Sequence, residues 1–231
     1  MKRYKYLLLG GVLLFTLLFA AKEEDHLIDV ADVIWKVPTS RKVVALTFDD
    51  GPDGRITPEI LEILREKEIK ATFFVVGEQV EKFPELISRE VAEGHEIGNH
   101  SYSHPALVNL PGNRITEELV KTEQEILKAA PKPILFRPPG GLTNENVLKI
   151  ARDNEYSVIL WSIDPVDWRV PIAGDIVEVV VKELKPGSII LLHDASFASS
   201  TPEALWFIID SLKARGYEFV TVTELLQYYE P

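Results

Sequence analysis

The hydrophobic pattern alternates between short, uniformly apolar runs and longer stretches in which apolar residues recur every three or four positions. The short runs are rich in β-branched and aromatic residues, and turn-forming residues bound them, as is typical of strands buried on both faces. We expect seven such strands, at 43–48, 71–76, 95–99, 133–137, 157–162, 188–193 and 218–222.

The longer stretches predict helices between these strands. In the first stretch, Thr57 is placed to cap a helix and Pro58 suits its first turn. Ile60, Leu61 and Leu64 then form an apolar face. We expect helices at 57–67, 79–93, 115–129, 144–153, 174–184, 202–215 and 223–229.

Regular alternation of apolar strands and helices predicts an α/β fold, with a parallel sheet covered by helices on both faces. The length of 231 residues and the absence of an internal repeat fit a single domain. Both a (β/α) barrel and an open doubly wound sheet satisfy the pattern, because periodicity does not distinguish a closed sheet from an open one. In either fold, chemistry collects where the strands end.

The first residues have the pattern of an export segment. Lys2, Arg3 and Lys5 precede an apolar run from Leu7 to Ala21, as in a secretory signal peptide. At about 1.5 Å per residue, the run falls short of the ~30 Å hydrocarbon core. We predict a signal peptide or short membrane anchor at 1–21, which contacts the membrane or the secretion machinery. A tether at 22–41 and the folded domain at 42–231 follow.

Composition and net charge argue against some classes of function. The formal net charge is −11, and a nucleic-acid partner is disfavoured because the phosphate backbone requires clustered Lys and Arg. The chain has no cysteine. Thiolate and disulfide chemistry are therefore excluded, and a metal site must be built from His and carboxylates.

Polar residues follow five of the predicted strands directly. Taken one at a time, each has an ordinary explanation; the Asp-Asp-Gly-Pro sequence, for example, also suits a simple turn. Together, at one edge of one sheet, they predict an active site. These residues are Asp49 and Asp50, His100 and His104, Arg137, Asp164, Asp167 and Trp168, and His193 with Asp194.

The histidines are few and uneven in their placement. His100 and His104 are four residues apart, a spacing that suits two ligands of one metal ion but also two solvated side chains. Pro105 disfavours a long helix there, so we expect a short turn. His95 begins a strand, at the opposite edge, and we interpret it as structural. His26 lies in the tether and is assigned no role.

The order of these motifs resembles the polysaccharide deacetylases of the NodB-homology type, carbohydrate esterase family 4. The resemblance covers residues 42 to about 229 and implies a distorted (β/α) barrel with fewer than eight strands, in agreement with the seven expected above. The motifs that carry it are TFDDGP, HSYSH, RPPGG, DPVDW and LLH.

The resemblance also implies a metal site and a general base. Asp50, His100 and His104 are expected to hold a divalent metal, usually zinc, with cobalt, manganese and nickel as alternatives. The metal would polarise the acetyl carbonyl and acidify the attacking water. Asp49 is expected to accept the proton of that water.

Further roles are implied for the remaining motifs. His193 is the expected general acid, Asp167 raises its pKa, and Arg137 orients Asp49. The backbone N–H of Gly140 is expected to stabilise the oxyanion. Two apolar side chains, those of Trp168 and Leu191, are expected to wall the acetyl pocket.

One position departs from the family pattern. Many members carry an aromatic residue where this chain has Gly140. The backbone donor survives that change, whereas an aromatic wall of the substrate site is lost.

The expected activity is metal-dependent removal of N-acetyl groups from N-acetylglucosamine units of peptidoglycan or a chitin-type oligomer. The enzyme would be secreted or anchored to the outer face of the cytoplasmic membrane. Hydrolysis of acetyl esters on xylan-type glycans is the alternative within the family. A non-catalytic glycan-binding protein and a two-histidine, one-carboxylate iron oxygenase are the alternatives outside it; the oxygenase leaves Arg137, Asp167 and His193 without a role.

Overall fold

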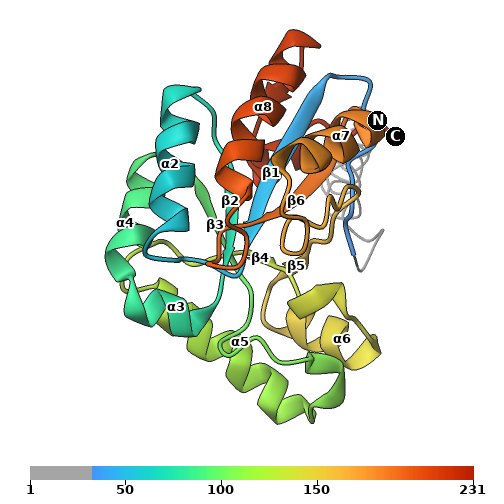
Figure 1. Cartoon of the computed structure of the whole chain (residues 1–231). Helices are drawn as coiled ribbons and strands as arrows, with labels where there is room; N and C mark the ends of the chain where they lie inside the picture. Colours follow the sequence, from blue (N-terminus) through green and yellow to red (C-terminus); the bar gives the residue numbers. More distant parts are fainter. Residues whose placement is uncertain (1–32) are drawn as a thin grey trace, which may run out of the picture. The chain divides into compact units, whose positions relative to one another are not determined.

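The computed structural model describes residues 33–231 (Figure 1). The signal or anchor predicted at 1–21 and the first part of the predicted tether lie outside the described residues. No helix within 33–231 is both long enough and apolar enough to cross a bilayer.

The seven predicted strands all form, and every pairing between them is parallel. The sheet has the order β5-β4-β3-β2-β1-β6, and β7 pairs with the first residues of β1. The strands are β1 (Val43–Asp49), β2 (Thr72–Val75), β3 (Glu96–Asn99), β4 (Leu135–Phe136), β5 (Ser157–Val158), β6 (Ile189–His193) and β7 (Glu218–Phe219).

Helices surround the sheet (Figure 1). They are α2 (Ile56–Glu66), α3 (Gly77–Lys82), α4 (Pro84–Ala92), α5 (Gly112–Ile126), α6 (Glu145–Asp153), α7 (Ala173–Glu183), α8 (Thr201–Ala214) and α9 (Val222–Leu226), with 3-10 turns η1 (Leu107–Asn109) and η2 (Pro139–Gly141). The single helix predicted at 79–93 is two helices, which meet at Phe83. Pro84 explains the break, because it suits a first helical turn and disfavours helix at the residue before it.

The two edges of the sheet, β5 and β6, are joined by irregular backbone. Ile163 forms a parallel bridge with Ile190, and residues 34–36 bridge Ile159 and Ser188. The sheet therefore curls into a distorted (β/α) barrel, which confirms the predicted single-domain fold.

The end of the predicted tether packs against the barrel. We call residues 33–38 the seam segment, because they lie between the edges β5 and β6. Val37 is buried, and its N–H donates to the carbonyl of Gly187 (2.9 Å). The backbone N–H of Ser40 donates to the carboxylate of Glu230 (2.7 Å). The compact unit begins at Val33 and not at the predicted boundary of 42.

The side chains of strand β1 alternate between the helix-covered face of the sheet and the interior of the barrel. All its residues are buried, because helices cover one face and the barrel interior lies on the other. Val44, Leu46 and Phe48 belong to the large cluster that includes residues of α2, α7 and α8. Thr47 and Asp49 alternate with them and contact Arg137. The alternation of the strand therefore places a carboxylate inside the barrel where β1 ends.

Candidate active site

Asp194 fixes the turn after β1 through hydrogen bonds to residues before and after it. The carboxylate of Asp194 accepts a hydrogen bond from Thr57 Oγ1 (2.6 Å), and the Asp194 N–H donates to the Asp49 carbonyl (3.1 Å). A Cβ at Gly51 would lie 2.0 Å from Asp194 Oδ2, so only glycine permits this approach. Asp50 has a φ of +75°, which turns its side chain toward the histidines.

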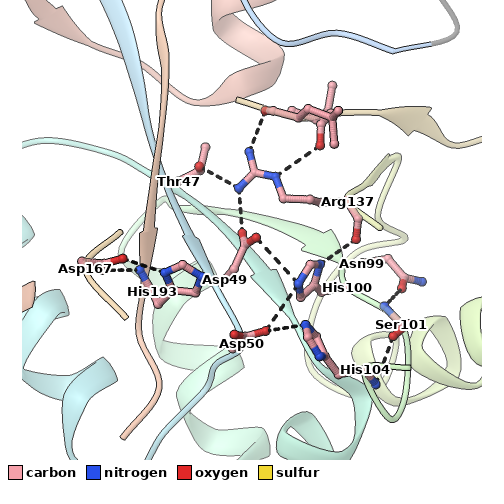
Figure 2. A network of polar contacts seen from close by, with 12 residues as sticks. Thr47, Asp49, Asp50, Asn99, His100, Ser101, His104, Arg137, Asp167 and His193 are labelled. Carbon is pink, nitrogen blue, oxygen red and sulfur yellow. Dashed lines mark hydrogen bonds and ion pairs between the residues drawn. The ribbon is translucent and has the colours of Figure 1, made fainter. Parts of the chain in front are cut away.

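His100 and His104 come from the loop after β3 and face Asp50 (Figure 2). Nδ1 of the buried His100 lies 2.6 Å from the Arg137 carbonyl oxygen, which can only accept. Nδ1 therefore carries the proton, and Nε2 presents its lone pair to the site. Nε2 of His100 and of His104 lie 3.4 and 3.0 Å from Asp50 Oδ1.

These donors fit a divalent cation. One ligand atom from each of Asp50, His100 and His104 lies within 4.8 Å of the others. Asp50 Oδ1 is buried and has no hydrogen-bond partner among the described residues. Burial raises the pKa of Asp50, but short polar contacts with His100 and His104 and their positive charge outweigh burial and hold the pKa well below its usual range. A carboxylate beside two imidazoles is a donor set that suits a divalent metal ion.

Asp49 is oriented by a fully buried arginine. Arg137 Nη1 donates to Asp49 Oδ1 (2.6 Å) and to Thr47 Oγ1 (2.8 Å). The carbonyls of Ile159 and Leu160 accept from Nε and Nη2. Asp49 Oδ2 points toward His100 Nε2, 3.7 Å away. The arginine thus occupies one oxygen of Asp49 and leaves the other facing the metal-ligand cluster.

His193 ends β6 and pairs with Asp167. Its Nδ1 lies 2.7 Å from Asp167 Oδ1, while Asp167 Oδ2 accepts from the His193 N–H (2.8 Å) and from Thr201 Oγ1 (2.6 Å). Burial lowers the pKa of His193, but Asp167, Asp49 and Asp50 raise it to about 9. His193 is therefore protonated at neutral pH, and its Nε2–H is free of the Asp167 contact.

The predicted residues share one cleft of about 750 Å³. Its lining includes Asp49, Asp50, His100, His104, Gly140, Trp168, Leu191 and His193. Arg137 and Asp167 stand behind it, in contact with Asp49 and His193. Leu191 is buried and Trp168 is half exposed, and the structure brings both to the wall of the cleft.

The sequence analysis missed two aromatic residues of the cleft, Trp161 and Phe197. Phe197 is 53% exposed, with its ring 6.0 Å from that of His193. Phe197 is an isolated aromatic residue in the polar loop after β6, and that position could have indicated a role in the cleft. A Cβ on Gly140 would approach Leu142 alone, at 3.8 Å, so the cleft is open where many family members carry an aromatic side chain.

His95 lies apart from this cleft, as expected of a structural residue. It is buried at the start of β3, accepts a hydrogen bond from the Ala71 N–H (3.2 Å) and packs against Phe73. Burial, with Lys70 and Arg89, lowers its pKa to about 4. His26 lies outside the described residues.

Known proteins resemble this chain in sequence and in fold. A family model described as polysaccharide deacetylase matches residues 36–159. A peptidoglycan-N-acetylglucosamine deacetylase of Bacillus cereus is 44% identical over 199 residues, covering 85% of this chain and 93% of the relative. A chitooligosaccharide deacetylase of a Bradyrhizobium species is 37% identical over 196 residues, covering 79% and 90%.

A solved structure agrees with the sequence relatives. The crystal structure of the Bc1960 peptidoglycan N-acetylglucosamine deacetylase, in complex with a substituted benzamide, has a TM-score of 0.82 and 39% identity. It covers 86% of this chain and 95% of its own. The ordered motifs, the barrel and these relatives agree, and the chain belongs to the polysaccharide deacetylase family of hydrolases.

Proposed function

We propose that the protein is a metal-dependent enzyme that removes N-acetyl groups from N-acetylglucosamine units of peptidoglycan. The observation that carries the proposal is the convergence of an oriented carboxylate, a cation-binding donor set and a charged imidazole in one cleft. Relatives named for peptidoglycan and for chitooligosaccharides support this substrate class, with a chitin-type oligomer as the second substrate.

Asp49 serves as the general base in this proposal. Because Arg137 holds Oδ1, Oδ2 accepts the proton of the attacking water. A divalent cation held by Asp50, His100 and His104 would polarise the acetyl carbonyl and lower the pKa of that water. We propose zinc, since three protein ligands leave positions open for water and substrate. The backbone N–H of Gly140, which lines the cleft, donates to the developing oxyanion.

His193 serves as the general acid. As the C–N bond breaks, its Nε2–H protonates the departing sugar amine, which is a poor leaving group without that proton. Asp167 binds Nδ1 and keeps the ring oriented and charged. Leu191 and Trp168 line the same cleft and would hold the acetyl methyl group.

Two adjacent carboxylates give the sharpest test. Asp49→Asn removes the proposed base and should lower kcat by about 10²–10⁴-fold while zinc still binds. Asp50→Asn removes a ligand and should lower zinc affinity itself. Acetate release would be measured on peptidoglycan fragments and chitooligosaccharides, with zinc and after chelation, beside zinc binding for each variant.

The outcomes separate the alternatives. Release that stops on chelation and in both variants supports the proposal, and the preferred glycan identifies the substrate. Zinc binding without release from either glycan would contradict N-deacetylation, and acetylated xylan would then be tested. Absence of both release and metal binding would leave a glycan-binding protein.

We also propose that the enzyme acts outside the cytoplasmic membrane, secreted or anchored at its outer face. The charged and apolar pattern of residues 1–21 supports export, and peptidoglycan lies outside that membrane. Cell fractionation should find the full chain in the medium or membrane fraction, and a chain without residues 1–25 in the cytosol.

A further inference from the structure

The loop that carries both histidines follows a strained backbone path. Ser101 has a φ of +65° and His104 a φ of +55°. Residues other than glycine rarely adopt this left-handed backbone conformation, because their Cβ crowds the following carbonyl oxygen. Such residues persist only where surrounding contacts hold them. The relative position of His100 and His104 therefore depends on what binds the residues between them.

Helix α3 binds the carbonyl side of this loop. The N–H groups of Gly77 and Glu78 donate to the carbonyls of Ser101 and Tyr102, each at 3.0 Å. A Cβ at Gly77 would lie 2.5 Å from the Tyr102 ring, so glycine is needed for this close approach. The first N–H groups of a helix have no partner within the helix, and here the loop supplies acceptors for them.

Helix α5 binds the N–H side through one carboxylate. Glu118 Oε2 accepts from the N–H groups of Tyr102 (2.9 Å) and Ser103 (2.7 Å), and Oε1 accepts from Ser103 Oγ (2.8 Å). Glu118 is only 7% exposed. A buried carboxylate is costly unless donors satisfy it, and here the loop provides the donors. Hydrogen bonds to an ionised acceptor are stronger than those between neutral groups.

We propose that Glu118 is a positioning residue that sets the separation of the two histidines for metal binding. His100 is also held by the carbonyl of Arg137. The side chain of His104 is 41% exposed, and its backbone N–H donates to Ser101 Oγ (3.2 Å) inside the same loop. Its place relative to His100 therefore follows the path that Glu118 imposes. This assignment rests on the proposed function of the metal site.

Glu118→Gln is the test variant, and Glu117→Gln is its matched control. Glutamine keeps the shape of the side chain but removes its charge, and an NH₂ group replaces one of the two acceptor oxygens that the loop uses. Glu117 precedes Glu118 on the same helix, and its carboxylate is exposed and paired with Arg114. Each purified protein would be measured for its zinc dissociation constant by chelator competition, for the visible spectrum of its cobalt form, and for melting in chelator.

Glu118→Gln should weaken zinc binding by about 10–100-fold and alter the cobalt spectrum, as loss of an outer-shell partner does. Glu117→Gln should bind zinc like the wild type. A folded Glu118→Gln protein with wild-type zinc affinity and cobalt spectrum overturns the assignment alone. Wild-type protein that binds neither ion overturns the proposed function as well.

A second variant covers the case in which Glu118→Gln does not fold. Ser103→Ala removes one of the donors to Glu118 and leaves the carboxylate in place. We expect a smaller loss of zinc affinity in the same direction. Wild-type zinc affinity in a folded Ser103→Ala protein would then overturn the assignment.

Discussion

At the scale of single residues, the pair His193–Asp167 determines the pH range of the proposed reaction. An acid catalyst must hold its proton until the amine leaves, and burial alone would take that proton away from His193. Asp167, with Asp49 and Asp50, reverses the effect and raises the pKa of His193 to about 9. We therefore expect activity to persist through neutral pH and to fall as His193 loses its proton above about pH 9.

Asp167→Asn tests this account. Loss of the carboxylate lowers the pKa of His193, so the alkaline limit of kcat/KM should move to lower pH, and activity should fall more at pH 8 than at pH 6. Asp164→Asn is the control, because Asp164 lines the same cleft but accepts from the Val166 N–H. An alkaline limit that Asp167→Asn leaves in place would show that another group is the acid.

At the scale of elements, helix α4 buries a carboxyl group that has no hydrogen-bond partner among the described residues. Glu90 is fully buried, and neither carboxylate oxygen has a hydrogen-bond partner within residues 33–231. Burial, and then the charge of Asp194, raise the pKa of Glu90 well above 4.5. The folded protein thus retains a proton that the unfolded chain releases.

Glu90→Leu should raise the free energy of unfolding at pH 7 by about 1–3 kcal/mol, since an unpartnered polar group is replaced by an apolar one. The folded pKa is the higher one, so the contribution of Glu90 to stability is greatest below pH 4.5 and is lost as pH rises through the folded pKa. Glu90→Gln should remove this part of the pH dependence but not the burial penalty. Urea unfolding at several pH values would measure both, and equal pH slopes in all three proteins would contradict the account.

The elements and the site differ in how far the sequence predicts them. Strands such as 43–48 are predictable, because a strand buried on both faces must be apolar along its length. The motif residues are predictable for a related reason, since parallel strands end at one edge. The contacts of Glu118 with Tyr102 and Ser103 are not, because they join a helix and a loop through tertiary packing. The packing of the seam segment is likewise not predictable from local sequence, because its bridges go to Ile159 and Ser188, far along the chain.

At the scale of the whole molecule, aromatic side chains stand at the mouth of the cleft. Trp168 and Phe197 are about half exposed and line it, and Trp161 lies beside Gly141. Exposed aromatic rings offer apolar faces to the C–H groups of sugars. We expect the glycan to contact Phe197, whose ring lies next to that of His193.

Phe197→Ala should raise KM for chitooligosaccharides by up to about tenfold, equivalent to ~1.4 kcal/mol, with little change in kcat. Phe207→Ala is a matched control, because Phe207 is also 53% exposed but lies on α8, away from the cleft lining. Steady-state kinetics on oligomers of increasing length would measure the effect. Equal KM values for the two variants would exclude Phe197 from substrate binding.

A truncation tests the seam segment. A chain that begins at Val33 keeps the bridges of residues 34–36 to Ile159 and Ser188, whereas one that begins at Lys42 loses them. We expect the longer protein to unfold cooperatively and the shorter one to melt at lower temperature or to aggregate. Identical melting curves would show that the segment contributes nothing to the barrel.

The seam segment also determines how late in synthesis the barrel can close. Residues 34–36 are made early, but Ile159 and Ser188, which they bridge, are made much later. The barrel therefore cannot close on the ribosome before most of the chain has emerged, and pairings this far apart in sequence form slowly. An export machinery that threads unfolded polypeptide would meet this chain while its barrel is still open. Under the proposed export, the distant pairing of this short segment would leave the nascent chain unfolded for passage through a membrane.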